Sequence, residues 1–141
     1  MPMTLAQADA IASGVLTKAH ELALEPMAVA VVDPGGHVLV VKREEEAGFF
    51  YADIVVSKAW SSVAIGRAAA AAGGALAERG VLGALTKVSG GKFLPLKGSV
   101  LVRNQSGEIM GAVGVAGPSG ADSDEQCAVH AVEALALIAE V

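Results

Sequence analysis

The sequence is poor in cysteine, in aromatic residues and in clustered positive charge. Its single cysteine, Cys127, cannot form an internal disulfide, so the chain carries no mark of an oxidising compartment. Aromatic residues make up 4%, and the 10 Lys and Arg residues are outnumbered by 15 Asp and Glu and form no basic run. Because nucleic-acid binding needs clustered Lys and Arg, we expect no nucleic-acid partner.

Long apolar runs and targeting segments are also missing. No uncharged apolar run reaches the roughly 18 residues of a membrane span. Residues 1–14 lack the basic start of a signal peptide and contain Asp9. We therefore expect a soluble, cytoplasmic protein with no membrane partner.

Small apolar residues dominate what the sequence does contain. Hydrophobic residues make up 53% and charged residues 18%, and much of the apolar excess is alanine and glycine. A chain of 141 residues suits one domain with one core. We expect a single domain over residues 1–141 that exposes apolar surface and covers it by self-association.

Helical spacing of apolar residues predicts helices at both ends and in the middle of the chain. The expected helices start at Thr4, cover residues 50–66 and 67–80, and run from Ser123 through Ile138. The first and last have the form of a capping box, with Gln7 and Gln126 three residues after the caps. The helix at 50–66 is apolar on most sides, which indicates burial.

Two β-hairpins are expected between these helices. The turn Asp33-Pro34-Gly35-Gly36 joins two β-rich runs, and residues 99–117 contain the second pair. Residues 81–98 are expected to form a long irregular loop, which usually has a function, with room for a short strand. The fold class predicted is a three-layer-like α/β sandwich, with a mainly antiparallel five-stranded sheet flanked by helices.

The helix at 50–66 contains two candidate buried ions, Asp53 and Lys58. Buried ions need partners and often have shifted pKa values. Lys58 is able to form a Schiff base with a carbonyl substrate or to pair with a carboxylate. A structural ion pair is an equally good interpretation, and the sequence does not decide between the two.

A glycine loop and three acidic residues precede the last helix. Gly117 and Gly120 resemble a phosphate cradle, but Asp122, Asp124 and Glu125 already complement the helix dipole and would repel an anion. Asp124 is the best candidate for a general base or an amine-binding group. The favoured expectation, however, is that Asp124 is an acidic residue in solvent at a helix start.

Two reactive residue types follow in that helix, Cys127 and His130. Their spacing of three makes them neighbours, yet a second pair of metal ligands is missing. Cys127 is expected to be buried and inert, and His130 to lie at the exposed edge. In the loop before the second hairpin, Gly90, Gly91, Lys92 and Phe93 suit a pocket rim or a subunit contact.

Four passages in this order make the chain resemble the GlcG/HbpS-like family, which includes the C-terminal domain of PduO-type proteins. They are AVAVVDPGGHVLVVKR, DIVVSKAWSS, the double glycine followed by Pro95-Leu96, and GEIMGAVGVAG with DEQCA. Together they span almost the whole chain. Phe93 and Leu94 are extra residues between Lys92 and Pro95 relative to the family pattern.

The resemblance implies a profilin-like or PAS-like sandwich that assembles into dimers or larger particles, often octamers. Some members bind haem, in some cases through a histidine of the first helix, and His20 lies in that region. Other relatives are enzymes that condense an amino acid with an oxo-acid. The family therefore implies the architecture more firmly than the activity.

Three hypotheses follow. In the first, an oligomer binds haem or a related tetrapyrrole and degrades it slowly, with His20 on the iron and Lys58 or Lys92 near the propionates. In the second, a cofactor-free enzyme acts on a small oxo-acid or amino-acid-like compound. There Lys58 polarises the carbonyl, Asp124 or Asp53 moves the proton, and amides of the Gly90-Gly91 and Gly117 loops hold an oxyanion. In the third, the chain is an assembly module without catalysis.

Overall fold

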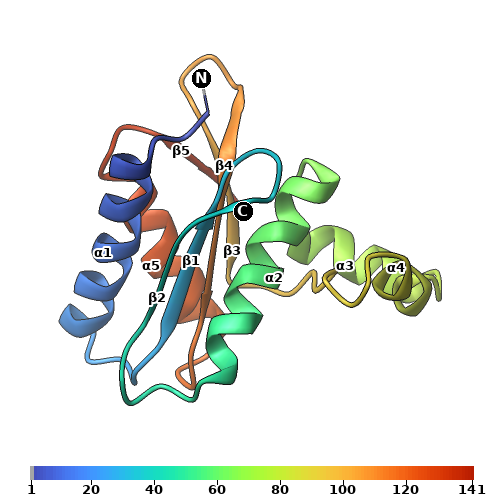
Figure 1. The fold of residues 1–141 in the computed structure, drawn as a ribbon, viewed down its shortest axis with the longest axis horizontal. Helices are drawn as coiled ribbons and strands as arrows, with labels where there is room; N and C mark the ends of the chain where they lie inside the picture. Colours follow the sequence, from blue (N-terminus) through green and yellow to red (C-terminus); the bar gives the residue numbers. More distant parts are fainter. Residues whose placement is uncertain (1) are drawn as a thin grey trace.

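A computed structural model describes residues 2–141 and places them in three layers (Figure 1). Helices α1 and α5 cover one face of an antiparallel sheet, α2 covers the other, and α3 and α4 extend away beyond α2. The elements are α1 (Leu5–Glu21), β1 (Ala28–Val32), β2 (Val38–Arg43), α2 (Phe50–Ile65), α3 (Ala69–Glu78), α4 (Leu82–Val88), β3 (Ser99–Arg103), β4 (Ile109–Ala116), α5 (Ala121–Glu133) and β5 (Ile138–Glu140).

The sheet has the strand order β2-β1-β4-β3-β5, and all neighbouring strands are antiparallel. Both expected hairpins are present, β1 with β2 and β3 with β4. The capping box of α1 is also confirmed, since Thr4 and Gln7 exchange hydrogen bonds through their side chains and backbone amides. The α/β sandwich predicted from the sequence is therefore confirmed.

Three local expectations were wrong. Residues 81–98 contain a further helix, α4, which ends where Gly90 and Gly91 adopt positive φ and their amides bond back to it. The last helix ends at Glu133, and the chain beyond it turns to form β5 along the open edge of β3. Ser123 does not cap α5, because the helix begins earlier, after Gly120, whose φ of 108° favours glycine.

The face of the sheet toward α2 is made of small residues. Ala28, Ala30 and Ala116 pack on Val55 of the helix. A Cβ on Gly114 would lie 2.2 Å from the Val55 carbonyl oxygen. The α2 backbone therefore approaches the sheet closely.

The opposite face is built from larger apolar residues. Valines of β1 and β4 pack there with α1 and α5 in one continuous core, which includes Ile11, Val15, Val29, Val31, Val113 and Val115. All of these side chains are fully buried. The faces differ because β1 and β4 alternate valine with alanine or glycine along most of their paired length.

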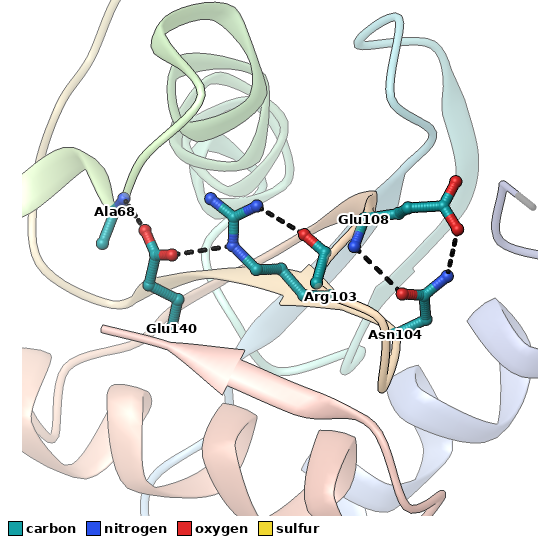
Figure 2. A network of polar contacts seen from close by, with 6 residues as sticks. Ala68, Arg103, Asn104, Glu108 and Glu140 are labelled. Carbon is teal, nitrogen blue, oxygen red and sulfur yellow. Dashed lines mark hydrogen bonds and ion pairs between the residues drawn. The ribbon is translucent and has the colours of Figure 1, made fainter.

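A polar network ties the C-terminal strand to the start of α3 (Figure 2). The Nε of Arg103 on β3 donates to Glu140 Oε1 on β5 at 2.8 Å. The other oxygen of Glu140 accepts the backbone N–H of Ala68 at 3.2 Å. Ala68 is the N-cap of α3 and no side chain of that helix caps it. The Glu140 carboxylate, from the C-terminal end of the sequence, therefore accepts a backbone N–H at the start of α3.

Candidate functional site

The outward side of α2 carries Trp60 between two cavities. The first has a volume of about 400 Å³ and is almost entirely apolar. Its lining residues are Trp60, Ala64, Ile65, Leu85, Val88, Ser89 and Phe93. The side chains come from α2, from α4 and from the segment after α4. Helix α4 and the segment after it therefore form the outer wall of this cavity.

The second cavity, of about 340 Å³, lies between the β1–β2 turn, α2 and the loop after α4. It is lined by Gly35, Gly36, His37, Val56, Ser57, Trp60 and Lys92. The Lys92 Nζ lies 5.8 Å from the centroid of the indole ring, within range of a cation–π interaction. A Cβ on Gly36 would lie 2.7 Å from the indole, so glycine is needed where the turn meets Trp60.

A third cavity of about 400 Å³ adjoins both. It shares Ser57 with the second cavity and Phe93 with the first, and adds Phe50, Asp53, Ile54, Thr86, Gly91 and Leu94. The three cavities form one region around the outer side of α2, which we call the α2 groove. Apolar walls with a few polar groups are typical of small-molecule sites.

An aspartate–histidine pair borders the α2 groove. Asp33 Oδ1 accepts the backbone N–H groups of Gly35 at 2.9 Å and His37 at 3.0 Å, and lies 3.2 Å from His37 Nδ1. Burial raises the pKa of Asp33, but these hydrogen bonds outweigh it and hold that pKa below its usual value. The carboxylate is thus an anion fixed by the turn itself.

The glycine-rich loop contributes to the α2 groove as the sequence indicated, although Phe93 is only 5% exposed rather than at the surface. Lys92 and Gly91 are exposed and line cavities. Gly90 is exposed and ends α4 instead. Trp60 and His37 were not singled out as site residues, although the turn motif Gly35-Gly36-His37 was a usable signal.

Lys58 and Asp124 meet in the interior, at the other side of α2. Lys58 is 5% exposed and donates to the Val115 carbonyl at 2.9 Å, and Asp124 is 2% exposed. A Cβ on Gly98 would lie 2.7 Å from Lys58 Nζ and 3.5 Å from the Asp124 Cβ, so glycine makes room for the pair. The expectation of a solvated acid at this helix start was wrong.

Burial dominates the electrostatics of this pair. It raises the pKa of Asp124 to about 6, although the Lys58 ammonium and a hydrogen bond from the Gly117 backbone oppose the shift. Burial also lowers the pKa of Lys58, against the attraction of Asp124. Within residues 2–141, Asp124 Oδ1 is buried without a hydrogen-bond partner. Neither residue lines the α2 groove.

The other candidates are spread over the molecule. Asp53 is exposed on the α2 groove and does not join Lys58, so the expectation of its burial was wrong. Gly117 packs against Met27, where a Cβ would lie 2.8 Å away. Glu125 lines a polar cavity on α5 together with His130. Of the side chains that the sequence suggested for a cofactor-free enzyme, the structure therefore brings only Lys58 and Asp124 together.

His20 and Cys127 lie on the α1–α5 side of the sheet. The His20 Nε2 is 2.6 Å from Glu44 Oε2, and its side chain is 67% exposed. Cys127 is fully buried, and burial raises the pKa of its thiol, which agrees with an inert residue. Since α1 and α2 cover opposite faces, one chain does not place His20 beside Lys92.

Within residues 2–141, no helix is both long and apolar enough to cross a bilayer. Within the same residues, no group of three or more His, Cys, Asp and Glu side chains is arranged to hold a metal ion.

Comparisons with known proteins agree with this architecture. The model of the family described as haem degrading protein HbpS-like matches residues 3–133. Klebsiella pneumoniae protein ORFY has a TM-score of 0.83 at 28% identity, over 95% of this chain and 90% of that chain. A double mutant of Streptomyces reticuli HbpS has a TM-score of 0.82 at 27% identity, over 96% and 88%.

The crystal structure of a PduOC–haem complex has a TM-score of 0.87 and covers 100% of both chains. At 20% identity it supports the fold alone. The search of curated proteins found no match.

Proposed function

The chain belongs to the HbpS-like family, and from this premise we propose that it binds haem in the α2 groove. The observation that carries the proposal is the apolar cavity of about 400 Å³ directly beside a polar cavity with a lysine and a histidine. Haem has the same division into an apolar macrocycle and an edge with two carboxylates. The family model, described as haem degrading protein HbpS-like, supports the choice of haem as the ligand.

The residues of the α2 groove fit such a ligand chemically. Trp60, Leu85 and Phe93 offer apolar walls for a macrocycle. Lys92 is exposed in the adjacent cavity and offers a positive charge for a propionate. When bound, haem supplies a redox-active iron, and the protein supplies binding, orientation and exclusion of water.

We infer that the bound form involves a second copy of the chain. Several large apolar side chains on the α2–α4 side are exposed, with Phe49 at 83%, Phe50 at 65% and Val88 at 86%. Phe50 and Val88 line cavities of the α2 groove itself. Contact with a second copy would bury these side chains and close the groove over its ligand.

The cofactor-free enzyme has weaker support from the geometry. Lys58 and Asp124 do have the shifted pKa values typical of catalytic groups. However, the side chains that line the α2 groove include neither of them. A structural role explains the same observations without a substrate, because the two side chains lie buried near one another and Lys58 donates to the Val115 carbonyl.

A haemin titration followed by the Soret band tests the proposal. We expect saturable binding by the wild-type protein and at least tenfold weaker binding by Trp60→Ala. Leu5→Ala is the matched control, because Leu5 is an apolar side chain that is 61% exposed on α1, away from the groove. Equal titrations of all three proteins, or no saturation in the wild type, would contradict haem binding at this site.

Degradation is tested on the same complexes. Loss of the Soret band with ascorbate and oxygen, faster than for free haemin and with release of iron, would extend the proposal to haem breakdown. A stable band would limit the function to binding. Circular dichroism of each variant shows whether the fold is kept.

A further inference from the structure

We propose that His37, on the β1–β2 turn, is the side chain that binds the haem iron through Nε2, with Asp33 as its positioning residue. The inference rests on the proposed haem binding and adds the iron ligand to it. Four observations support it: the contacts of Asp33, the state of each histidine nitrogen, the cavity beside His37, and the surroundings of the other two histidines.

The Asp33 carboxylate is fixed before it meets the imidazole. Its Oδ1 accepts two backbone amides of its own turn, from Gly35 at 2.9 Å and from His37 at 3.0 Å. The same oxygen lies 3.2 Å from His37 Nδ1. A histidine that binds a metal through one nitrogen commonly donates its other N–H to a carboxylate, which fixes the tautomer and raises the ligand's basicity.

This pairing leaves the other ring nitrogen, Nε2, available. With the proton on Nδ1, the lone pair is on Nε2. Among residues 2–141 the ring contacts recorded for His37 involve Nδ1 only, and its side chain is 81% exposed. No existing hydrogen bond has to break before Nε2 binds a metal.

The cavity beside His37 supplies the other groups that haem requires. Trp60 and Val56 form an apolar wall there, and Lys92 lies at its rim. The turn is held against that wall, since Gly36 packs on the indole with no room for a Cβ. The His37 side chain is thus exposed, whereas the backbone of its turn is already held by packing. Haem binding would therefore fix only the position of the imidazole ring.

His20 differs from His37 at each of these points. Its Nε2 already lies 2.6 Å from Glu44 Oε2, so this nitrogen is paired with a carboxylate. The other oxygen of Glu44 accepts the Met27 amide at 3.0 Å, which holds that carboxylate in place. His20 also belongs to α1, across the sheet from the α2 groove.

His130 is exposed in a different setting. It lines a polar cavity on α5 together with Asp122, Glu125 and Glu133. Three carboxylates would repel the two propionates of haem. The same cavity includes Lys18 as the only cation among its lining residues. Within residues 2–141, His37 is the one histidine that combines an Nε2 outside any hydrogen bond, an apolar wall and an exposed lysine nearby.

The test uses the full chain and four variants: His37→Ala, His20→Ala, His130→Ala and Asp33→Asn. Each is titrated with haemin, and the ferric complex is examined by Soret position and electron paramagnetic resonance. We expect His37→Ala to bind haemin at least tenfold more weakly and to lose the spectrum of an imidazole-bound iron. Added imidazole should restore that spectrum. His20→Ala and His130→Ala should match the wild type.

Asp33→Asn tests whether the Asp33 carboxylate orients the His37 imidazole or only helps to pack the turn. Loss of an orienting carboxylate typically weakens metal binding by about 10- to 100-fold while the ligand remains. We expect Asp33→Asn to keep an imidazole-bound spectrum, with weaker affinity and a lower iron–histidine stretching frequency in resonance Raman of the ferrous form. An unchanged frequency and affinity would overturn the positioning role of Asp33.

The outcomes distinguish this inference from the proposed function. If His20→Ala loses the imidazole-bound spectrum while His37→Ala keeps it, the inference is overturned and haem binding stands. If the wild-type protein shows no saturable band, the proposed function fails together with the inference. Loss in His37→Ala alone, with imidazole rescue, supports both.

Discussion

The two faces of the sheet are both covered by helices, but they are packed in different ways. Toward α1 and α5, large apolar side chains such as Ile11 and Val113 interlock in one continuous core. Toward α2, alanine and glycine bring the helix backbone close to the strands, and the core divides into two small clusters. Four of the five buried polar residues within residues 2–141 lie on that second side, Lys58, Ser61 and Ser62 on α2 and Ser99 on β3; the fifth, Asp124, lies at the start of α5.

This difference in packing gives the two faces different roles: the α1–α5 face contributes to stability, and the α2 face carries the groove proposed to bind the ligand. Burying one large aliphatic side chain contributes about 1.5–3 kcal/mol, so the valine face supplies most of the folding free energy. The small-residue face leaves little depth for bulky side chains between α2 and the sheet. Trp60 and Ile65 line the α2 groove instead, and Ile54 both lines the groove and packs against the small-residue cluster.

One added methyl group at Gly114 of β4 should disrupt the close contact between α2 and the sheet. We expect Gly114→Ala to lower the free energy of unfolding by about 4 kcal/mol or more, because the new Cβ would lie 2.2 Å from the Val55 oxygen and 3.0 Å from the Ala59 nitrogen. Both are backbone atoms, so no side chain can move aside. Urea unfolding measures the change.

Gly74→Ala is the matched control for that substitution. Gly74 lies in α3, and a Cβ there would meet nothing within 4 Å. Alanine is about 1 kcal/mol better than glycine inside a helix, so this variant should be more stable than the wild type. Similar losses in the two variants would contradict the close-approach argument.

The valine face can be weakened without touching the α2 groove. Ile11→Ala should cost about 2–4 kcal/mol, because Ile11 is fully buried in the α1–α5 core and leaves a cavity. Haemin affinity, measured where the variant is still folded, should stay within twofold of the wild type. A large loss of affinity would show that the two faces are coupled.

The buried pair on the α2 side should appear in the pH dependence of stability. The pKa of Asp124 is about 6 when folded and 3.8 in its reference state, so between these values the folded protein binds more protons than the unfolded one. Stability from this group therefore falls as pH rises. Relative to Asp124→Asn, the wild type should lose about 2 kcal/mol between pH 4.5 and pH 7.

Urea unfolding of both proteins at the two pH values gives this difference directly. Other carboxylates titrate equally in both proteins, so their contributions cancel. A constant difference between wild type and Asp124→Asn would mean that the carboxyl is not shifted upward.

The smallest effect on folding is expected at the rim of the α2 groove. Val88 is 86% exposed on α4, so Val88→Ser should change the free energy of unfolding by no more than about 0.5 kcal/mol. Self-association should weaken, because an exposed apolar side chain is lost. Analytical ultracentrifugation at several concentrations compares the variant with the wild type, and unchanged association would exclude Val88 from the contact.

Much of the fold followed from local patterns. The capping box at Thr4, the turn after Asp33 and the end of α2 before Gly66 are short-range signals, and the structure confirms each. The errors came where a distant partner decides. Residues 138–140 continue a helical stripe in sequence, but the open edge of β3 offers them hydrogen bonds and they become β5.

The site was less predictable than the fold. Lys92 and Phe93 were identified from a glycine-rich loop, and both line the α2 groove. His37 and Trp60 gave weaker signals, since a histidine after a turn and a tryptophan in an apolar helix are common in many folds. Only the packing of Gly36 on the indole brings these positions together.

The sequence by itself determined α1, α2, α3 and the two hairpins, because capping, turn chemistry and alternating residue size act over a few positions. It also determined that one sheet face would be small and the other large. The tertiary structure alone decided that Asp124 is buried beside Lys58 rather than solvated, and that His37 meets Trp60 and Lys92 in one cavity. Burial and cavity walls depend on residues far apart in the chain, and their effect on charge exists only after the layers have packed.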